Sequence, residues 1–298
     1  MLEQKHIDII CSALSITEKD IVDIKVNRGG FSNSTYVVSI SDGNKYLYRI
    51  PGPRTEIMCD RHAECVTHKL LAPYKFTQEI KYFDTETGIM LCYYYPIART
   101  VKWDDKGDWQ AAADMIRKFH SLPIKLELDI SNSDRIERNE KLYEDCGGKF
   151  SDEYYAFMKE KYPFLCNVYE KMRLDAVPST GDFTPANILF VEGGKTVMID
   201  LEYTGNADPY TDLSIFVHDM RLDDEHSLEF LEMYLGRKPT REEELRLFLQ
   251  CAFTGLRWYT WANCKMILGG AEEFYIDFAV YSMDYAQRHY DVVKEYLK

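Results

Sequence analysis

The 298-residue chain is long enough for one large or two modest domains, and its composition, 46% hydrophobic and 29% charged, is that of an ordinary globular protein. A formal net charge of −13 argues against nucleic acid as the main partner, because a phosphate-binding surface needs an excess of Lys and Arg. The cysteines form no C-x-x-C pair, the N-terminus lacks a secretory apolar region, and no apolar run approaches the roughly 20 residues that span a bilayer. We therefore expect a cytoplasmic protein without membrane insertion.

The first 95 residues predict a small antiparallel sheet with helices beside it. Apolar residues recur at helical spacing from Ile7 to Leu14, and Thr17 followed by Asp20 resembles a capping box. The Asp42-Gly43 pair predicts a tight hairpin turn, because Gly supplies the positive φ that such turns require. A further helix is predicted over 58–72, and strands are predicted over 23–28, 34–41, 45–51, 79–84 and 88–95.

After Pro96 the sequence becomes mainly helical, with one small strand pair. Helices are predicted around 109–119, over 154–162, after Pro163, and over 240–268 and 271–297, whereas 188–191 and 196–200 read as strands. A small sheet followed by a larger helical part predicts an α+β protein of two lobes. We place the N-lobe at residues 1–95 and the C-lobe at residues 96–298.

The stretch from Thr180 to Asp200 carries the strongest chemical signal. Asp182 is followed five residues later by Asn187, and the predicted hairpin then returns the chain to Asp200 at the end of an apolar strand. This is a phosphoryl-transfer layout, in which Asp182 would accept the proton of a substrate hydroxyl. Asn187 and Asp200 would hold Mg²⁺ across the phosphates of a nucleotide. An Asp and an Asn at this spacing arise often by chance, and the strand ending in Asp is what makes the pattern specific.

The predicted sheet offers residues that suit the nucleotide itself. A turn between two strands supplies backbone N–H groups that could approach phosphates, at Gly29, Gly30, Ser32 and Asn33. One strand later Arg49 could contact the α- and β-phosphates, and Glu64 on the next helix could pair with it. A Gly-Gly turn, or a surface Arg and Glu, would be unremarkable alone, so these residues are candidates because the other half of the pattern is present.

Together these stretches resemble the choline/ethanolamine kinase family, part of the broader aminoglycoside-phosphotransferase group, and bacterial choline kinases most of all. The resemblance covers nearly the whole chain, and its further motifs are Arg61-x-x-Glu64, Phe119-His120-Ser121, Ile199-Asp200-x-Glu202-Tyr203 and Asp208-Pro-x-x-Asp212-Leu. It implies a protein-kinase-like fold with ATP in its cleft, the adenine being held by the backbone near Tyr94 and Tyr95. It also implies a structural role for Asp212, which would hydrogen-bond the catalytic-loop backbone.

Two positions depart from the family's pattern. The family's loop usually begins with His where this chain has Thr180, and Trp commonly follows the metal-binding Asp where this chain has Leu201. In the family that His supports the loop and is not the base. We therefore expect the Thr180 hydroxyl to support the loop instead, and activity to survive.

Aromatic residues near the C-terminus point to the substrate. Trp258 and Trp261 lie three residues apart on a predicted helix and so share one face. The resemblance implies an aromatic box around a quaternary ammonium, which cation–π attraction favours, with Glu202 as a nearby negative charge. Aromatic residues at helical spacing are more often core, so the residues alone leave pocket and core equally favoured for the two indoles. For the rings between Phe274 and Tyr281 we expect a place in the core.

The leading hypothesis is a Mg²⁺- and ATP-dependent transferase that phosphorylates choline. Ethanolamine and aminoglycosides are alternative acceptors, although an aminoglycoside site should show an acidic cluster for several ammonium groups, whereas an indole pair suits one methylated ammonium. A hypothesis from another class is a catalytically weak kinase-fold protein that only binds nucleotide or choline. Thr180 suggests it, and the joint presence of Asp182, Asn187 and Asp200 speaks against it.

Overall fold

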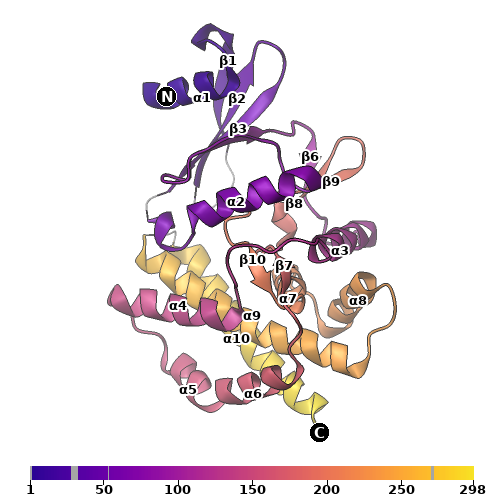
Figure 1. Ribbon diagram of the computed structural model, residues 1–298. Helices are drawn as coiled ribbons and strands as arrows, with labels where there is room; N and C mark the ends of the chain where they lie inside the picture. Colours follow the sequence, from indigo (N-terminus) through magenta and orange to yellow (C-terminus); the bar gives the residue numbers. More distant parts are fainter. Residues whose placement is uncertain (1, 28–32, 53, 270–271) are drawn as a thin grey trace. The chain divides into compact units, whose positions relative to one another are not determined.

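The computed structural model describes residues 2–27, 33–52, 54–269 and 272–298 (Figure 1). The chain divides into two compact units, each built from two separate segments. The sheet unit comprises Met1–Thr100 and Ala186–Tyr203, and the helical unit comprises Val101–Pro185 and Thr204–Lys298. This division differs from the one expected at 95/96, because the hairpin around residue 190 groups with the sheet unit.

The sheet unit contains a five-stranded antiparallel sheet in the order β1-β2-β3-β5-β4. Its strands are β1 (Ile21–Asn27), β2 (Asn33–Ile40), β3 (Lys45–Pro51), β4 (Ile80–Phe83) and β5 (Met90–Tyr93), and its helices are α1 (Gln4–Leu14) and α2 (Arg61–Leu71). Gly43 has a φ of 90° in the turn between β2 and β3, which confirms the predicted hairpin. The predicted capping box is also present, at the start of the 3₁₀ turn Glu18–Asp20. Ile10 of α1 packs with Val38, Tyr48 and Leu91 in the core of this unit.

A second, three-stranded sheet completes the unit. It has the order β6-β8-β9, formed by β6 (Ala98–Arg99), β8 (Ile188–Val191) and β9 (Lys195–Met198). The strand predicted over 196–200 therefore ends two residues early. Asp200 has a φ of 58°, in the left-handed region, and so cannot extend the strand.

The helical unit holds eight α-helices in its described part and one short strand pair. These elements are α3 (Lys106–His120), α4 (Asn132–Asp145), α5 (Asp152–Glu160), α6 (Tyr162–Met172), β7 (Val177–Ser179), β10 (Gly205–Ala207), α7 (Tyr210–Asp219), α8 (Asp224–Leu235), α9 (Arg241–Ile267) and α10 (Glu272–Tyr296). The two long helices α9 and α10 run side by side, as Figure 1 shows. None of the helices in the described part of the chain is both long enough and apolar enough to span a membrane.

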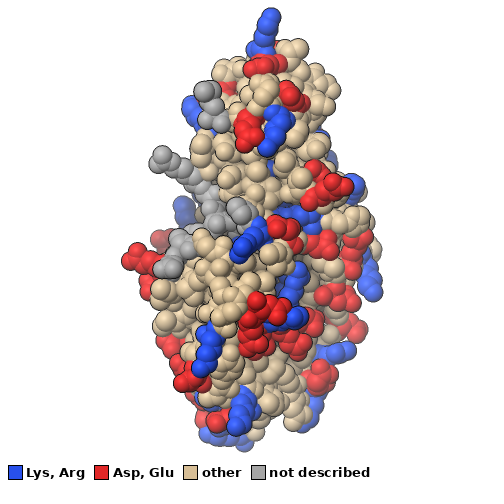
Figure 2. All heavy atoms as spheres, turned by 90° about the vertical axis from the view of Figure 1, so that its left-hand side faces the viewer, with Lys and Arg blue, Asp and Glu red and all other residues tan. Residues whose placement is uncertain are grey.

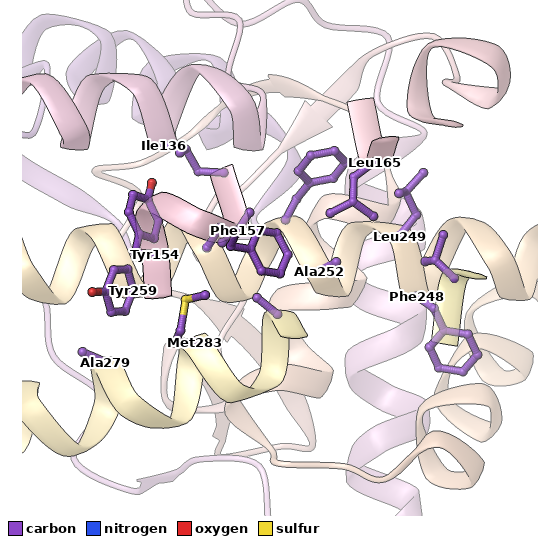
Figure 3. Close-up of a cluster of buried hydrophobic side chains, with 14 of the residues drawn as sticks. Ile136, Tyr154, Phe157, Leu165, Phe248, Leu249, Ala252, Tyr259, Ala279 and Met283 are labelled. Atoms are coloured by element: carbon purple, nitrogen blue, oxygen red, sulfur yellow. The ribbon is translucent and has the colours of Figure 1, made fainter. Parts of the chain in front are cut away.

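The core of the helical unit lies around α9. Figure 3 shows Tyr154 and Phe157 of α5 facing Tyr259 and Ala252 of α9, with Met283 of α10 on the other side. The Tyr154 and Tyr259 rings stack with centroids 4.9 Å apart. This packing fixes α9, the helix on which both candidate substrate-binding indoles lie. Acidic and basic side chains are interspersed on the face shown in Figure 2.

Candidate functional site

Asn187 and Asp200, the expected metal ligands, are held near each other by the hairpin β8–β9. The N–H of Ile199 donates to the carbonyl of Asn187 at 3.0 Å, which fixes the residue before Asp200 beside Asn187. Both side chains are half-buried. An amide oxygen and a carboxylate are hard oxygen donors, which Mg²⁺ prefers and which usually leave room for water and phosphate oxygens. The residues present therefore fit the group that the sequence implies.

Arg49 and Glu64 form the ion pair expected from the sequence. Arg49 Nη1 lies 2.7 Å from Glu64 Oε1, and both side chains are almost wholly buried. Burial alone would raise the pKa of Glu64, but the charge of Arg49 and its hydrogen bond hold that pKa below the usual range. Burial alone would lower the pKa of Arg49, but Glu64, then Asp200 and Glu202, raise it. Both partners are therefore charged, and Asp200 lies close enough to Arg49 to act on it.

Glu202 is part of the same charged cluster. Its Oε2 lies 2.9 Å from Nη1 of Arg61, and the two side chains are each 4% exposed. The same Arg61 nitrogen lies 2.8 Å from Glu64 Oε2. The carboxylate expected to face a cationic substrate is thus already paired with a cation. Sequence reasoning gave Arg61 no role, although the Arg61-x-x-Glu64 motif was visible.

The remaining nucleotide-binding candidates are only partly described. Gly29, Gly30 and Ser32 lie outside the described residues, and Asn33 begins β2 with a half-buried side chain. The N–H of Tyr94 donates to the carbonyl of Lys45 at 3.0 Å, so this backbone group is engaged in the sheet. Tyr95 lines a pocket of about 1060 Å³ within the sheet unit, between α2, β4 and the hairpin β8–β9. Among its described lining residues Arg49, Glu64, Asn187 and Asp200 do not appear, although His68, which lines it, lies 3.9 Å from Glu64 Oε1.

In the helical unit, Asp212 at the start of α7 organises the loop that contains Asp182. Its Oδ1 accepts hydrogen bonds from the Thr180 hydroxyl at 2.8 Å and the Gly181 N–H at 3.0 Å, and its Oδ2 accepts from the Thr180 N–H at 3.0 Å. The Thr180 oxygen in turn accepts from the Asp182 N–H at 3.1 Å. Burial alone would raise the pKa of Asp212, but the hydrogen bonds from His120 and Thr180 lower it. The loop thus has the hydroxyl support expected for Thr180.

Two residues that sequence reasoning did not assign also hold this loop. His120, at the end of α3, bonds Asp212 Oδ2 through Nε2 at 3.0 Å and the Tyr234 hydroxyl through Nδ1 at 2.9 Å. Arg257 of α9 donates to the Gly181 carbonyl, and its guanidinium lies 4.9 Å from the ring centroid of Trp258. The Phe119-His120-Ser121 motif signalled the first of these. Nothing in the sequence signalled the second, because only the fold brings α9 to the loop.

Trp258 and Trp261 lie together on α9. Their rings meet edge to face with centroids 5.3 Å apart, and Phe278 lies near both, at 6.1 Å and 6.0 Å. Trp258 is buried, at 6% exposed, whereas Trp261 is half-buried against the core. The ammonium of Lys265 lies 5.5 Å from the Trp261 ring centroid.

The rings between Phe274 and Tyr281 meet the expectation of core placement only in part. Tyr275 is buried and belongs to the core around α9. Phe274 is 41% exposed, which contradicts a core position for this ring. It lies near the start of α10, where its ring stacks on that of Phe278 with centroids 5.8 Å apart.

A family model and two curated relatives match this chain over different lengths. A family model described as "Phosphotransferase enzyme family" matches residues 23–248. Aminoglycoside 3'-phosphotransferase of Enterococcus faecalis is 31% identical over 140 residues, covering 44% of this chain but only 52% of that protein. Protein LicA of Haemophilus influenzae is 21% identical over 280 residues, covering 87% of this chain and 77% of that protein.

Solved structures share the fold across the whole chain. The crystal structure of choline kinase LicA from Streptococcus pneumoniae superposes with a TM-score of 0.82 at 19% identity, covering 97% of this chain and 99% of that one. A structure of LicA in complex with AMP superposes with a TM-score of 0.76 at 18% identity, covering 96% and 98%. At these identities the likeness establishes the protein-kinase-like fold.

Proposed function

Because this chain belongs to the phosphotransferase enzyme family, we propose that it transfers the γ-phosphate of ATP to the hydroxyl of a small cationic alcohol, with choline as the preferred acceptor. The observation that supports the proposal is the hairpin β8–β9, whose Ile199–Asn187 backbone bond holds Asn187 beside the residue before Asp200, as two ligands of one metal ion would require. The intact Arg49–Glu64 pair supports it from the nucleotide side.

Each residue has a distinct chemical part in this proposal. Asp182 accepts the proton of the acceptor's hydroxyl group while the hydroxyl oxygen attacks the γ-phosphorus of ATP. The departing group is ADP. Arg49 holds the α- and β-phosphates, and Asn187 and Asp200 hold Mg²⁺. The metal, when bound, neutralises charge on the phosphate oxygens. Thr180 and Asp212 keep the Asp182 loop in one conformation.

Choline is preferred because the candidate pocket is aromatic. Trp258 and Trp261 with Phe278 can offer π surface to a methylated ammonium, which water solvates weakly. Arg257 already lies over one face of Trp258, so a substrate cation would have to meet another ring face. A substrate with several ammonium groups is less favoured, because Glu202, the carboxylate expected to face a cationic substrate, is already paired with Arg61.

The proposal is tested by coupled ADP release with choline, ethanolamine, kanamycin or no acceptor, each with ATP and Mg²⁺. We expect kcat/KM to be highest for choline, by about tenfold over ethanolamine, since about 1.4 kcal/mol of added cation–π attraction gives that ratio. A higher value for kanamycin would contradict the choline assignment and favour an aminoglycoside kinase. Nucleotide binding without ADP release from any acceptor would favour the catalytically weak alternative. Asp182→Asn serves as the inactive control.

A further inference from the structure

We propose that Arg61 is a positioning residue that holds Asp200 in its metal-binding conformation through Glu202. The inference deepens the proposed function and rests on it for the role of Asp200. It starts from a continuous series of short ion pairs within the sheet unit. Arg49 lies 2.7 Å from Glu64, Glu64 lies 2.8 Å from Arg61, and Arg61 lies 2.9 Å from Glu202.

The series is buried and electrically balanced. Two arginines face two glutamates, and all four side chains are at most 5% exposed. Burial alone would lower the pKa of Arg61, but Glu202 raises it, so the guanidinium stays charged. Removing one member of such a set leaves an uncompensated buried charge, which is far more disruptive than losing a surface pair. Arg61 therefore has an energetic reason to stay on Glu202.

The segment that carries Glu202 also carries Asp200, and its backbone is unusual. Asp200 has a φ of 58°, which costs a non-glycine residue roughly 1 kcal/mol or more unless the surroundings hold it. On one side the Ile199–Asn187 bond fixes the chain. On the other side Leu201 is fully buried and Glu202 is bound by Arg61. The Arg61–Glu202 contact is thus the polar anchor that follows the strained residue.

Helix α2 makes this anchor rigid. Arg61 is the first residue of α2, and the Asp60 carboxylate caps the helix by accepting the Ala63 N–H at 3.0 Å. Glu64 lies one turn later on the same helix, so the helix that carries the partner of Arg49 also carries the anchor of Glu202. Loss of Arg61 should therefore weaken metal binding, and leave the Trp258–Trp261 ring cluster of the helical unit unchanged.

The test compares Arg61→Gln, Arg61→Lys, Glu202→Gln and the double variant Arg61→Gln/Glu202→Gln, with Arg173→Gln as matched control. Arg173 pairs with Glu170 at 3.8 Å on the surface of the other unit, so its loss should change nothing. Binding of MgADP is measured by titration calorimetry over a range of Mg²⁺ concentrations, and no acceptor is needed. Thermal midpoints are recorded for all variants.

We expect Arg61→Gln to raise the Mg²⁺ concentration for half-maximal MgADP binding by about tenfold, and Arg61→Lys by less, because Lys keeps the charge but not the shared contact. The double variant should need no more Mg²⁺ for half-maximal MgADP binding than Arg61→Gln does, because both changes act through one contact.

Unchanged Mg²⁺ dependence in Arg61→Gln with a lowered thermal midpoint would overturn the proposal and leave Arg61 a structural residue. If Arg61→Gln does not fold, Arg61→Lys decides by the same criterion. Failure of the wild type to bind MgADP would instead count against the proposed function itself.

Discussion

Thr180 is the residue at which this chain departs most clearly from the pattern it resembles. Its hydroxyl group does two things at once, because it donates to Asp212 Oδ1 and accepts from the Asp182 N–H. A further contact to Asp212 comes from the imidazole of His120, which lies on α3 in a different part of the chain. Asp212 is therefore held by a hydroxyl from the Asp182 loop and by a ring from a distant helix.

Replacing Thr180 with Val should lower kcat by about tenfold, while KM for both substrates stays within about twofold. Val has the same shape but leaves Asp212 and the Asp182 N–H each short of one buried partner. Steady-state kinetics with choline and ATP provide the measurement. Thr180→Ser is the matched control, since it keeps the hydroxyl, and a loss of kcat in Thr180→Ser but not in Thr180→Val would show that the methyl group matters instead.

The role of Trp258 and Trp261 can be decided by comparing binding with stability. If their rings face the substrate, Trp→Leu at either position should raise the choline KM by about tenfold and leave the ATP KM unchanged, because Leu keeps apolar bulk but lacks the π face. A core role would instead lower the thermal midpoint without a selective effect on choline. Phe274→Leu is a useful comparison, because this exposed ring is expected to alter neither quantity strongly.

Among the elements, α9 and α10 show how closely two helices can pack. A Cβ atom at residue 255 of α9 would lie 2.6 Å from the Ser282 carbonyl oxygen and 2.7 Å from the Ala286 nitrogen, both in the backbone of α10. Only glycine permits this approach, so Gly255 is a packing residue in the middle of a long helix.

Gly255→Ala should therefore destabilise the protein by about 1–3 kcal/mol, although Ala is the better helix former by about 1 kcal/mol. The clash involves backbone atoms, which cannot rotate away as a side chain would. Urea unfolding followed by circular dichroism measures the change. Gly107→Ala, near the exposed start of α3, is the control and should be neutral or slightly stabilising. An increase in stability for Gly255→Ala would contradict the close packing of the two helices.

How far the elements could be predicted depended on their periodicity. Strands β3 and β8 were predicted with the bounds that the structure has, because turn residues delimit both. Helix α4 was not predicted, since its exposed face is so rich in charge that few apolar positions mark a period, although Ser131 and Asp134 form a capping box at its start.

At the site, the Arg49–Glu64 pair followed from sequence order. The contacts of Arg61 and Arg257 could not be predicted, because each joins segments far apart in the chain.

For the whole molecule, buried histidines should govern the response to mild acid. Burial lowers the pKa of His68 to about 4, and of His218 and His289 to about 3, the latter two with further contributions from neighbouring charges. In the unfolded chain each His has a pKa near 6.5. Below pH 6.5 the unfolded state therefore binds more protons than the folded state, and stability is lost as the pH falls.

Between pH 6.5 and 5.5 the free energy of unfolding should fall, with each of the three histidines approaching about 1.4 kcal/mol per pH unit at the acid end of this range. Buried carboxyls such as Asp208 and Asp219, whose pKa values burial raises, act in the opposite direction at lower pH, so the measurement stays above pH 5.5. Urea unfolding at several pH values gives the slope. His289→Gln should remove about one third of it, and an unchanged slope would show that His289 is not buried in its neutral form.

The interleaving of the two units has a consequence for synthesis on the ribosome. The chain leaves the sheet unit at Thr100 and returns to it only for Ala186–Tyr203. A nascent chain that has emerged as far as Pro185 therefore carries the sheet, Arg49 and Glu64, but neither Asn187 nor Asp200. The hairpin that brings these residues can pair with β6 only after a large part of the helical unit has been translated. The proposed ability to hold a metal-bound nucleotide would thus be acquired late in translation, and a chain cut short before residue 200 would lack it however well its first hundred residues had folded.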